Sequence, residues 1–311
     1  MTDLCRVENW LSEECGGKAL LVPSCTAALE AAFLLSDVRG REVILPSFAY
    51  PTCASSIIRA GGTPVFVDIE LETLCIDLEK AQDAISVETQ AVLPIWYAGV
   101  SNPNVGLLAE AFGISMVEDA AQCIGNFKLQ GNFGCISFHH TKNIGCGEGG
   151  ALIVRDDEEL ARTICACGTT RWKDRKKWEW EEVGSSFLMA EPLKKILWAE
   201  LHNLSYVTEK RLKVWKVYRD NIEATFKASK PGNGHIFWFL SDHREKLFSA
   251  IPELVGHYTP LHLTKPGLKY GRVHGLLGNS VYAAKRLVRP PMNVTEEEAF
   301  RISERINHEN E

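Results

Sequence analysis

Residues 137–150 read S-F-H-H-T-K-N-I-G-C-G-E-G-G, and this stretch places a lysine, Lys142, in a glycine-rich turn. Short apolar runs typical of strands lie on either side of the turn, at residues 135–138 and 151–154. The glycines allow the backbone to approach a ligand closely. Upstream, the segment V-E-D-A-A-Q at residues 117–122 ends another strand-like run with an acid and an amide. A lysine, an acid and an amide at the ends of different strands suggest one shared site.

The chemistry that best fits these groups is a Schiff base between the lysine and pyridoxal phosphate, with the acid on the pyridine nitrogen. By itself, a lysine in a glycine-rich turn is usually a solvated surface charge. Residues 145–150 also match the pattern G-x-G-x-x-G, but a dinucleotide site needs a strand before that pattern and a helix after it. A strand-like run follows here, which argues against a dinucleotide. The lysine hypothesis therefore depends on other parts of a cofactor site occurring along the chain.

Strand-like and helix-like segments alternate through the first half of the chain, which predicts an α/β fold with a mostly parallel sheet and helices on both faces. In such sheets, ligands bind beyond the carboxyl ends of the strands. Residues 24–26, Tyr50, Asp119 and Gln122 all follow expected strands. Residues 24–26 also begin a helix, where free N–H groups suit a phosphate, although Ser24 or Thr26 could simply cap that helix. The expected strands are residues 18–22, 42–45, 63–68, 91–97 and 114–117.

The second half of the chain is less regular. A charged, tryptophan-rich loop at residues 168–182 could be a solvated insertion, or it could stack on rings and pair with phosphates. Residues 191–226 have the periodicity of a long helical region. Beyond them we expect strands at residues 236–240 and 254–258 and a final helix at residues 295–308. We therefore expect a large cofactor-binding domain over residues 1–190, and a connecting helix and small α+β domain over residues 191–311.

Composition and charge narrow the possible functions. The chain has 311 residues and a net charge of −6, so it carries no basic field that would attract nucleic acid or an anionic membrane. No apolar run approaches the ~20 residues that a membrane span needs, and the N-terminus does not resemble a signal peptide. The ten cysteines are scattered without a C-x-x-C pair, which favours reduced thiols over disulfides or a metal site. We expect a cytoplasmic enzyme without a metal.

A set of segments resembles, in order, the motifs of the DegT/StrS sugar aminotransferases, which are fold type I enzymes dependent on pyridoxal 5′-phosphate. The segments are L-V-P-S-C-T-A-A-L-E, P-V-F-V-D, Y-A-G-V, V-E-D-A-A-Q, S-F-H-H-T-K-N, V-G-S-S-F-L and H-Y-T-P-L-H. They extend from residue 17 to residue 293. The resemblance implies transfer of an amino group from L-glutamate to a keto sugar linked to a nucleotide, such as dTDP-4-keto-6-deoxyhexose, for polysaccharide biosynthesis.

The resemblance also implies roles for particular residues in the cofactor site. Lys142 would bind the cofactor covalently, and Asp119 would pair with its pyridinium nitrogen. Gln122 would lie near the phenolic oxygen, and Tyr50 would stack on the ring. The phosphate positions would be those of Cys25, Thr26 and Ser137. Ser186 stands where relatives often have an asparagine that reaches the phosphate from the partner subunit, which implies a homodimer with its active site at the interface.

Sugar and diphosphate contacts are harder to assign, and the candidates are Arg171, His257, Tyr258 and His262. Relatives usually carry further N-terminal residues and longer loops, so we expect the sugar pocket to be altered. Two other functions stay open. The chain could be a pyridoxal-phosphate enzyme of other specificity, acting on a 3-keto sugar or as a dehydratase, although dehydratases of this fold replace the lysine with histidine. It could also be a non-catalytic regulator that keeps the fold.

Overall fold

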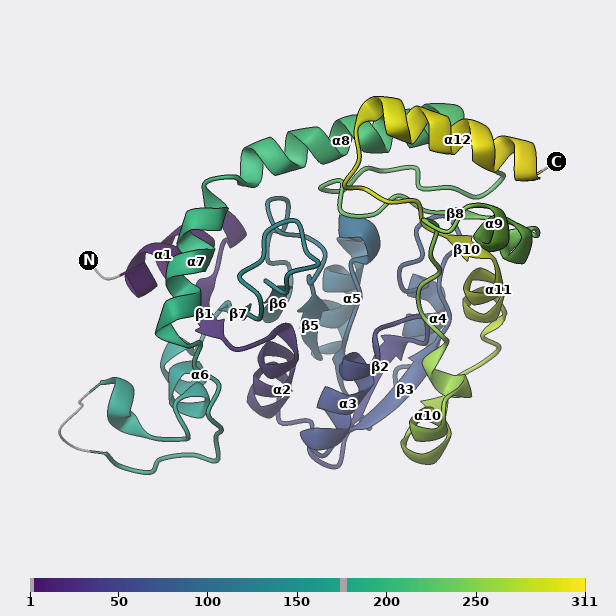
Figure 1. Cartoon of the computed structure of the whole chain (residues 1–311). Helices are drawn as coiled ribbons and strands as arrows, with labels where there is room; N and C mark the ends of the chain where they lie inside the picture. Colours follow the sequence, from purple (N-terminus) through teal and green to yellow (C-terminus); the bar gives the residue numbers. More distant parts are fainter. Residues whose placement is uncertain (1–2, 174–177, 311) are drawn as a thin grey trace.

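A computed structural model describes residues 3–173 and 178–310 of the chain, and an eight-stranded sheet forms its centre (Figure 1). The strand order is β1-β7-β6-β5-β4-β2-β3-β9. The strands are β1 (Lys18–Val22), β2 (Glu42–Pro46), β3 (Thr63–Val67), β4 (Thr89–Val92), β5 (Ser115–Asp119), β6 (Phe133–Ser137), β7 (Gly150–Val154) and β9 (Arg272–Val273). From β6 to β9 all neighbours are parallel, whereas β7 is antiparallel to β6 and β1. The expected α/β fold with a mostly parallel sheet is confirmed.

Helices cover both faces of the sheet because successive strand side chains point to opposite sides. Along β1, for example, Ala19 and Leu21 belong to one apolar cluster, whereas Leu20 and Val22 belong to the other. The first face carries α1 (Asp3–Cys15), α4 (Leu78–Asp83), α5 (Asn104–Phe112) and α7 (Glu191–Leu201). The second carries α2 (Cys25–Leu35), α3 (Pro51–Arg59) and α6 (Glu158–Cys165). The sheet is therefore the middle of three layers.

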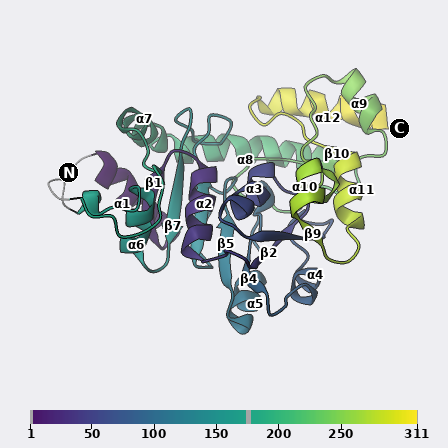
Figure 2. The same cartoon turned by 90° about the horizontal axis from the view of Figure 1, so that it is seen from below.

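The C-terminal part forms a third apolar cluster beside the sheet. Its elements are α8 (Leu204–Asn221), β8 (Phe239–Leu240), α9 (Arg244–Ala250), α10 (Lys265–Tyr270), α11 (Gly278–Arg286), β10 (Leu287–Val288) and α12 (Glu296–Asn310). Helices α8 and α12 lie side by side across one end of the molecule (Figures 1 and 2). Phe48 and Tyr97, which follow β2 and β4, belong to this cluster, and the ring of Phe48 lies 5.2 Å from that of Tyr258. The sheet and the C-terminal part thus share apolar contacts.

Several element boundaries differ from the sequence expectations. The long helical region divides into α7 and α8 at residues 202–203, where the chain turns from the sheet face toward the C-terminal part (Figure 1). The expected strand at 236–240 is a strand only at Phe239 and Leu240, which pair with β10, although the carbonyl of Trp238 also accepts a backbone hydrogen bond from Ala228 at 2.9 Å. The expected strand at 254–258 reduces to a single bridge from Val255 to Arg289. Both expected strands therefore pair over fewer residues than their sequences suggest.

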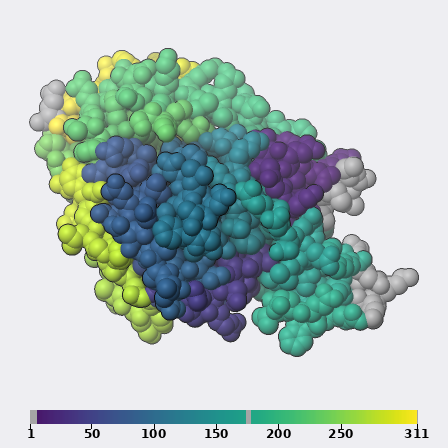
Figure 3. Space-filling view, turned by 180° about the vertical axis from the view of Figure 1, so that it is seen from behind, coloured from purple at the N-terminus to yellow at the C-terminus, as the bar shows by residue number. Residues whose placement is uncertain are grey.

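The tryptophan-rich loop extends away from the body of the molecule (Figures 1 and 3). Trp178 and Trp180 are exposed, and the guanidinium of Arg171 lies 5.9 Å from the centre of the Trp178 ring. The ammonium of Lys173 lies over Trp172 in the same way, at 5.2 Å. Residues 174–177 of this loop lie outside the described residues. Elsewhere along residues 3–173 and 178–310, no helix is both long enough and apolar enough to cross a bilayer.

Candidate active site

A cavity of about 830 Å³ opens where the parallel strands end. The polar side chains that line it come from both halves of the sequence, which are far apart along the chain. From the sheet side they are Ser24, Cys25, Thr26, Tyr50, Thr52, Asp119, Gln122, Ser137, His139, Thr141, Lys142 and Glu148. From the C-terminal part they are His235, His257, Tyr258, Thr259, Thr264 and Arg289. The structure therefore brings together the lysine, the acid and the amide, as the sequence predicts.

Lys142 lies in the connection between β6 and β7, at residues 138–149. Its backbone N–H donates to the carbonyl of His139 at 2.9 Å. A side chain on Gly145 would approach the same carbonyl oxygen to 2.7 Å, so this turn requires glycine. Burial lowers the pKa of Lys142, and Arg289 lowers it further, whereas the nearby Asp119 partly opposes this effect. The turn thus holds an amine whose neutral, nucleophilic form costs less than that of a solvated lysine.

Asp119 ends β5, between β4 and β6, and its carboxylate has a defined orientation. The backbone N–H of Ala121 donates to Oδ1 at 3.0 Å, and the thiol of Cys53 donates to Oδ2 at 3.1 Å. Burial and the Asp119 charge both raise the pKa of Cys53, so this thiol stays protonated and able to donate. An anionic carboxylate oriented in this way can pair with a cationic group in the cavity.

The N-terminus of α2 forms another edge of the cavity. Ser24 caps the helix by accepting a hydrogen bond from the backbone N–H of Ala27 at 3.2 Å, while Cys25 and Thr26 in the first turn line the cavity. A Cβ on Gly150 would lie 2.5 Å from the carbonyl carbon of Ser24, so β7 must begin with glycine for α2 to approach it. The serine cap and the anion site expected from the sequence therefore coexist. Free N–H groups and the positive end of the helix dipole suit a phosphate here.

Gln122 links the sheet side to the C-terminal part. Its side-chain oxygen accepts from the backbone N–H of Ala98 at 2.7 Å, and its amide nitrogen donates to the hydroxyl of Tyr258 at 3.0 Å. Tyr50 is 55% exposed at the mouth of the cavity, where its ring lies 6.3 Å from that of Tyr258. Gln122 is thus held rigidly, whereas Tyr50 is free to lie against a bound ring.

The opposite wall contains two histidines held as neutral rings. His257 stacks on Tyr258 at 3.6 Å, and its Nδ1 shares a 2.7 Å hydrogen bond with the hydroxyl of Tyr97. Burial and the charges of Arg289 and Lys142 lower the pKa of His257 to about 2. His235, whose Nδ1 lies 2.9 Å from the side-chain oxygen of Asn143, also has a lowered pKa, chiefly through burial. Because neither ring is charged near neutral pH, this wall can donate and accept hydrogen bonds without changing its charge.

Two of these residues, His235 and Arg289, were not among the residues expected from the sequence. His235 follows a P-G-N-G turn, and Arg289 follows the two-residue strand β10 and precedes two prolines. The sequence could therefore have indicated Arg289 as a site residue only through its position at the end of a short strand.

Three expected residues do not line this cavity. His262 lies on the short turn of Leu261–Leu263, and its Nδ1 is 2.6 Å from the hydroxyl of Ser47. Arg171 lies in the tryptophan-rich loop. Ser186 is exposed and forms a bridge with Ala166 at the base of that loop. The expected contribution of Ser186 to a partner subunit remains a prediction.

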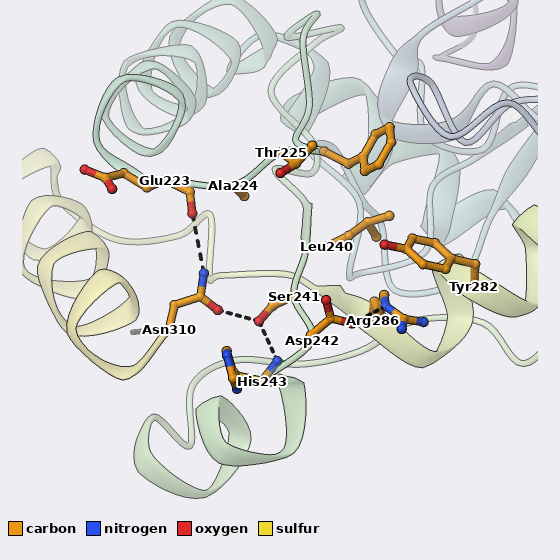
Figure 4. Close-up of a pocket in the computed structure, with 11 residues that line it drawn as sticks. Glu223, Ala224, Thr225, Leu240, Ser241, Asp242, His243, Tyr282, Arg286 and Asn310 are labelled. Carbon is orange, nitrogen blue, oxygen red and sulfur yellow. Dashed lines mark hydrogen bonds and ion pairs between the residues drawn. The ribbon is translucent and has the colours of Figure 1, made fainter.

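A second cavity, of about 630 Å³, lies in the C-terminal part between the end of α8 and helices α9, α11 and α12 (Figure 4). Its polar groups bind one another. Arg286 Nε lies 2.6 Å from the carboxylate of Asp242, and the hydroxyl of Ser241 donates to the side chain of Asn310 (Figure 4). Ser241 also accepts from the backbone N–H of His243 at 2.9 Å. These contacts stabilise the packing of the C-terminal elements, so the first cavity is the candidate active site.

Comparison with known families and structures identifies the family and the fold of the chain. The sequence profile of the DegT/DnrJ/EryC1/StrS aminotransferase family matches residues 6–244. Among solved structures, DesV of S. venezuelae in complex with a ketimine intermediate has a TM-score of 0.91 at 24% identity, covering 100% of this chain and 90% of that one. A putative sugar aminotransferase from Streptococcus pneumoniae in its PMP form has a TM-score of 0.87 at 20% identity, with the same coverage.

A dehydratase has a similar fold. The E. coli GDP-4-keto-6-deoxy-D-mannose-3-dehydratase with bound hydrated PLP has a TM-score of 0.88 at 21% identity, covering 98% of this chain and 92% of that one. These structures confirm the fold expected from the sequence, in which enzymes with different reactions share one architecture.

Proposed function

The chain belongs to the DegT/DnrJ/EryC1/StrS aminotransferase family, and from this premise we propose that it transfers an amino group from L-glutamate to a keto sugar linked to a nucleotide. The observation that carries the proposal is the placement of the buried Lys142 and the oriented carboxylate of Asp119 in one cavity, beside the N-terminus of α2. An amine, an acid and a phosphate-binding helix end are the three groups that an aminotransferase site needs.

The cofactor is pyridoxal 5′-phosphate, and the cavity meets its requirements. Lys142 would attach it covalently, and Asp119 would pair with its ring nitrogen. The first turn of α2, with Cys25 and Thr26, and the nearby Ser137 would bind its phosphate. Gly150 allows the N-terminus of α2 to approach β7 closely at this point. Tyr50 would lie against the ring, and Gln122 near its phenolic oxygen. When bound, the cofactor withdraws electrons from the donor carbon that carries the amino group, which makes the proton on that carbon acidic.

The residues of the chain then hold or move protons. Lys142 Nζ, as a free amine favoured by its lowered pKa, accepts the proton from the α-carbon of the donor and delivers it to the cofactor. The Asp119 carboxylate keeps the ring nitrogen protonated, because the hydrogen bonds from Ala121 and Cys53 hold it in place. The same Lys142 returns a proton in the opposite half-reaction, when the keto sugar receives the amino group.

For the acceptor, we propose a dTDP-4-keto-6-deoxyhexose, the substrate class of dTDP-4-amino-4,6-dideoxygalactose transaminase, in the cytoplasmic biosynthesis of polysaccharide precursors. His257 and Tyr258 line the cavity and are the better-placed contacts for the sugar. Arg171 and His262 do not line the cavity, so they would contact only a part of the substrate that extends beyond it. We also propose a homodimer in which Ser186 of one subunit approaches the cofactor phosphate of the other.

The first test is the visible absorbance of the purified protein loaded with pyridoxal phosphate, before and after L-glutamate is added. The proposal expects the band of the covalently bound cofactor to disappear as the amino group transfers. A colourless protein that cannot be loaded would contradict the cofactor assignment and favour a regulator. A stable band would contradict L-glutamate as the donor.

A dehydratase is the second candidate, because a dehydratase is among the structures with the same fold. His139 lines the cavity close to Lys142 along the chain, and dehydratases of this fold use a histidine in place of the lysine. Incubation with a dTDP-4-keto-6-deoxyhexose and L-glutamate separates the two reactions by mass spectrometry of the product. An aminotransferase produces an amino sugar, whereas a dehydratase produces a sugar that has lost a hydroxyl group.

A further inference from the structure

His235 is held firmly in the wall of the active-site cavity. Its backbone N–H donates to the side-chain oxygen of Asn233 at 3.1 Å, and its Nδ1 lies 2.9 Å from the side-chain oxygen of Asn143. Asn233 is itself buried, and its amide nitrogen donates to the carbonyl of Ile124 at 2.9 Å. Asn143 directly follows Lys142 in the sequence. These hydrogen bonds therefore tie His235 to the turn that carries the lysine.

The amide of Asn143 determines which ring nitrogen of His235 carries a proton. Asn143 Nδ2 donates to the backbone carbonyl of Asn233 at 2.9 Å, and a carbonyl oxygen can only accept. The end of the amide that faces His235 must therefore be its oxygen, so Nδ1 of the ring is the donor in their hydrogen bond. Burial lowers the pKa of His235, and the charges of Lys142 and Arg211 lower it further, so the ring is neutral. A neutral ring with its proton on Nδ1 has an unprotonated Nε2.

Nε2 of His235 is open to the cavity. Within residues 3–173 and 178–310 no group bonds to it, and it is not one of the polar atoms that are buried there without a partner. The ring lines the active-site cavity together with Lys142. His257 on the same wall differs, because the hydroxyl of Tyr97 beside its Nδ1 can either donate or accept and so allows both tautomers. His235 thus presents a fixed hydrogen-bond acceptor to the cavity.

An acceptor at this position favours a ligand group that donates a hydrogen bond. Carboxylates, diphosphates and keto oxygens only accept at neutral pH, so the lone pair of Nε2 repels them. The hydroxyl groups of a sugar can donate. The keto carbon of the proposed acceptor must come within reach of Lys142, and His235 is bonded to the next residue, Asn143. The sugar hydroxyl nearest to His235 is then the one on the carbon beside the keto carbon.

We infer that Nε2 of His235 accepts a hydrogen bond from the hydroxyl on the carbon adjacent to the keto carbon of the sugar, an inference that rests on the proposed aminotransferase function. The ring cannot turn to present a donor instead without losing its hydrogen bond to Asn143. A sugar that lacks this hydroxyl would leave Nε2 without a partner and would bind more weakly. His235 therefore contributes to the choice of the sugar, and its contribution appears as a ratio of two affinities.

Isothermal titration calorimetry with two sugars measures this ratio. The full chain loaded with pyridoxal phosphate, in the absence of an amino donor, is titrated with a dTDP-4-keto-6-deoxyhexose and with its analogue that lacks the hydroxyl at C3. We expect the wild type to bind the first sugar about tenfold more tightly, and His235→Phe to bind both equally. His235→Gln retains an acceptor and should keep part of the preference. His308→Gln alters an exposed histidine on α12 and should keep the wild-type ratio, and a general loss of packing would lower both affinities together.

The position of the proton has a test that needs no substrate. Nitrogen NMR of the full chain with isotope-labelled histidine distinguishes a protonated ring nitrogen from an unprotonated one. The resonances that disappear in His235→Phe are those of His235, and we expect Nδ1 to be protonated and Nε2 unprotonated at neutral pH. Asn143→Ala removes the oxygen that fixes the proton, so it should allow both tautomers and reduce the preference for the hydroxylated sugar.

Three results would overturn the inference. The first is a proton on Nε2, or a charged ring, in the wild type at neutral pH. The second is a wild type that binds the hydroxylated sugar no more tightly than its analogue. The third is an unchanged preference in a folded His235→Phe variant, with folding checked by circular dichroism. Failure of the proposed function has a separate signature, because the absorbance of the loaded wild type would then not respond to L-glutamate, whereas the calorimetric ratio does not depend on that reaction.

Discussion

The two walls of the active-site cavity are built differently. The sheet-side wall consists of residues at strand and helix ends, such as Asp119 at the end of β5 and Ser137 at the end of β6, and neighbouring strands fix their positions. The C-terminal wall consists of residues in irregular segments, such as His257 and Arg289, joined by a single backbone bridge between Val255 and Arg289. Regular pairing thus places the groups proposed for the chemistry, and local packing places those proposed to select the substrate. Substitutions on the sheet side should therefore lower the rate of the chemical step, whereas substitutions on the C-terminal wall should mainly weaken substrate binding.

The largest effect is expected on the sheet side, from Lys142→Ala. Without the amine there is no covalent attachment and no group to move the α-proton, so the rate of the L-glutamate half-reaction should fall by at least about 10⁴-fold. Stopped-flow absorbance of the loaded protein measures this rate. Lys269→Ala, which alters an exposed lysine on α10, serves as the control and should react as the wild type does. Transamination retained in Lys142→Ala would refute the role of this lysine.

Asp119→Asn should produce the next largest loss, about 10²- to 10³-fold in kcat. The amide keeps the shape of the side chain and can still accept from Ala121, but it cannot balance the charge of a protonated ring nitrogen. Steady-state kinetics measures the loss, and the absorbance of the loaded protein should change as well. Asp83→Asn, on the exposed end of α4, is the control. An unchanged kcat would mean that Asp119 has only a structural role.

Cys53 tests whether the orientation of Asp119 matters. Cys53→Ala removes the thiol that donates to Asp119 Oδ2 and should lower kcat about tenfold, whereas Cys53→Ser restores a donor and most of the rate. The apparent KM for L-glutamate should change little, because Cys53 is buried and does not line the cavity. Cys75→Ala removes another buried thiol, in the C-terminal cluster, and controls for loss of packing. Equal kinetic effects at both cysteines would contradict a positioning role for Cys53.

The smallest effect is expected on the C-terminal wall, in the pH dependence of the reaction. A histidine with a pKa of about 2 is neutral above about pH 3, so His257 should not change charge over the working range. His257→Asn should therefore lower kcat/KM for the sugar severalfold without moving the apparent pKa values of the pH profile. Profiles recorded between about pH 5 and pH 9 provide the comparison. The prediction would be wrong if the wild-type activity fell at low pH within this range and the activity of His257→Asn did not.

The contrast between the two walls also explains what could be predicted from the sequence. Strand periodicity and the rule for strand ends predict the parallel sheet and bring Lys142, Asp119 and Gln122 together, because regular elements limit where side chains can lie. The C-terminal wall depends on the path of the chain after α8, where the strands are only two residues long. Local sequence does not specify such a path.

Individual residues show the same limit. Arg289 was not expected because a two-residue strand gives little periodicity. His262 was expected at the cavity through the motif H-Y-T-P-L-H, but the short turn of Leu261–Leu263 directs it to Ser47 instead. A single turn of the backbone is enough to direct a side chain away from a site. The sequence pattern does not predict the direction in which such a turn points its side chains.

The edge strand β9 has a consequence for how the chain acquires its fold. Arg272 and Val273 complete the sheet by pairing with Val65 and Phe66 on β3, and Arg272 forms an ion pair with Glu42. Residues so distant in sequence meet late, because closing a long loop costs conformational entropy before any contact stabilises it. During synthesis on the ribosome, the β3 edge therefore stays open until residue 273 has emerged, and an open edge can pair with another chain. The two residues of β9 thus cover part of an edge that could otherwise pair with a second chain.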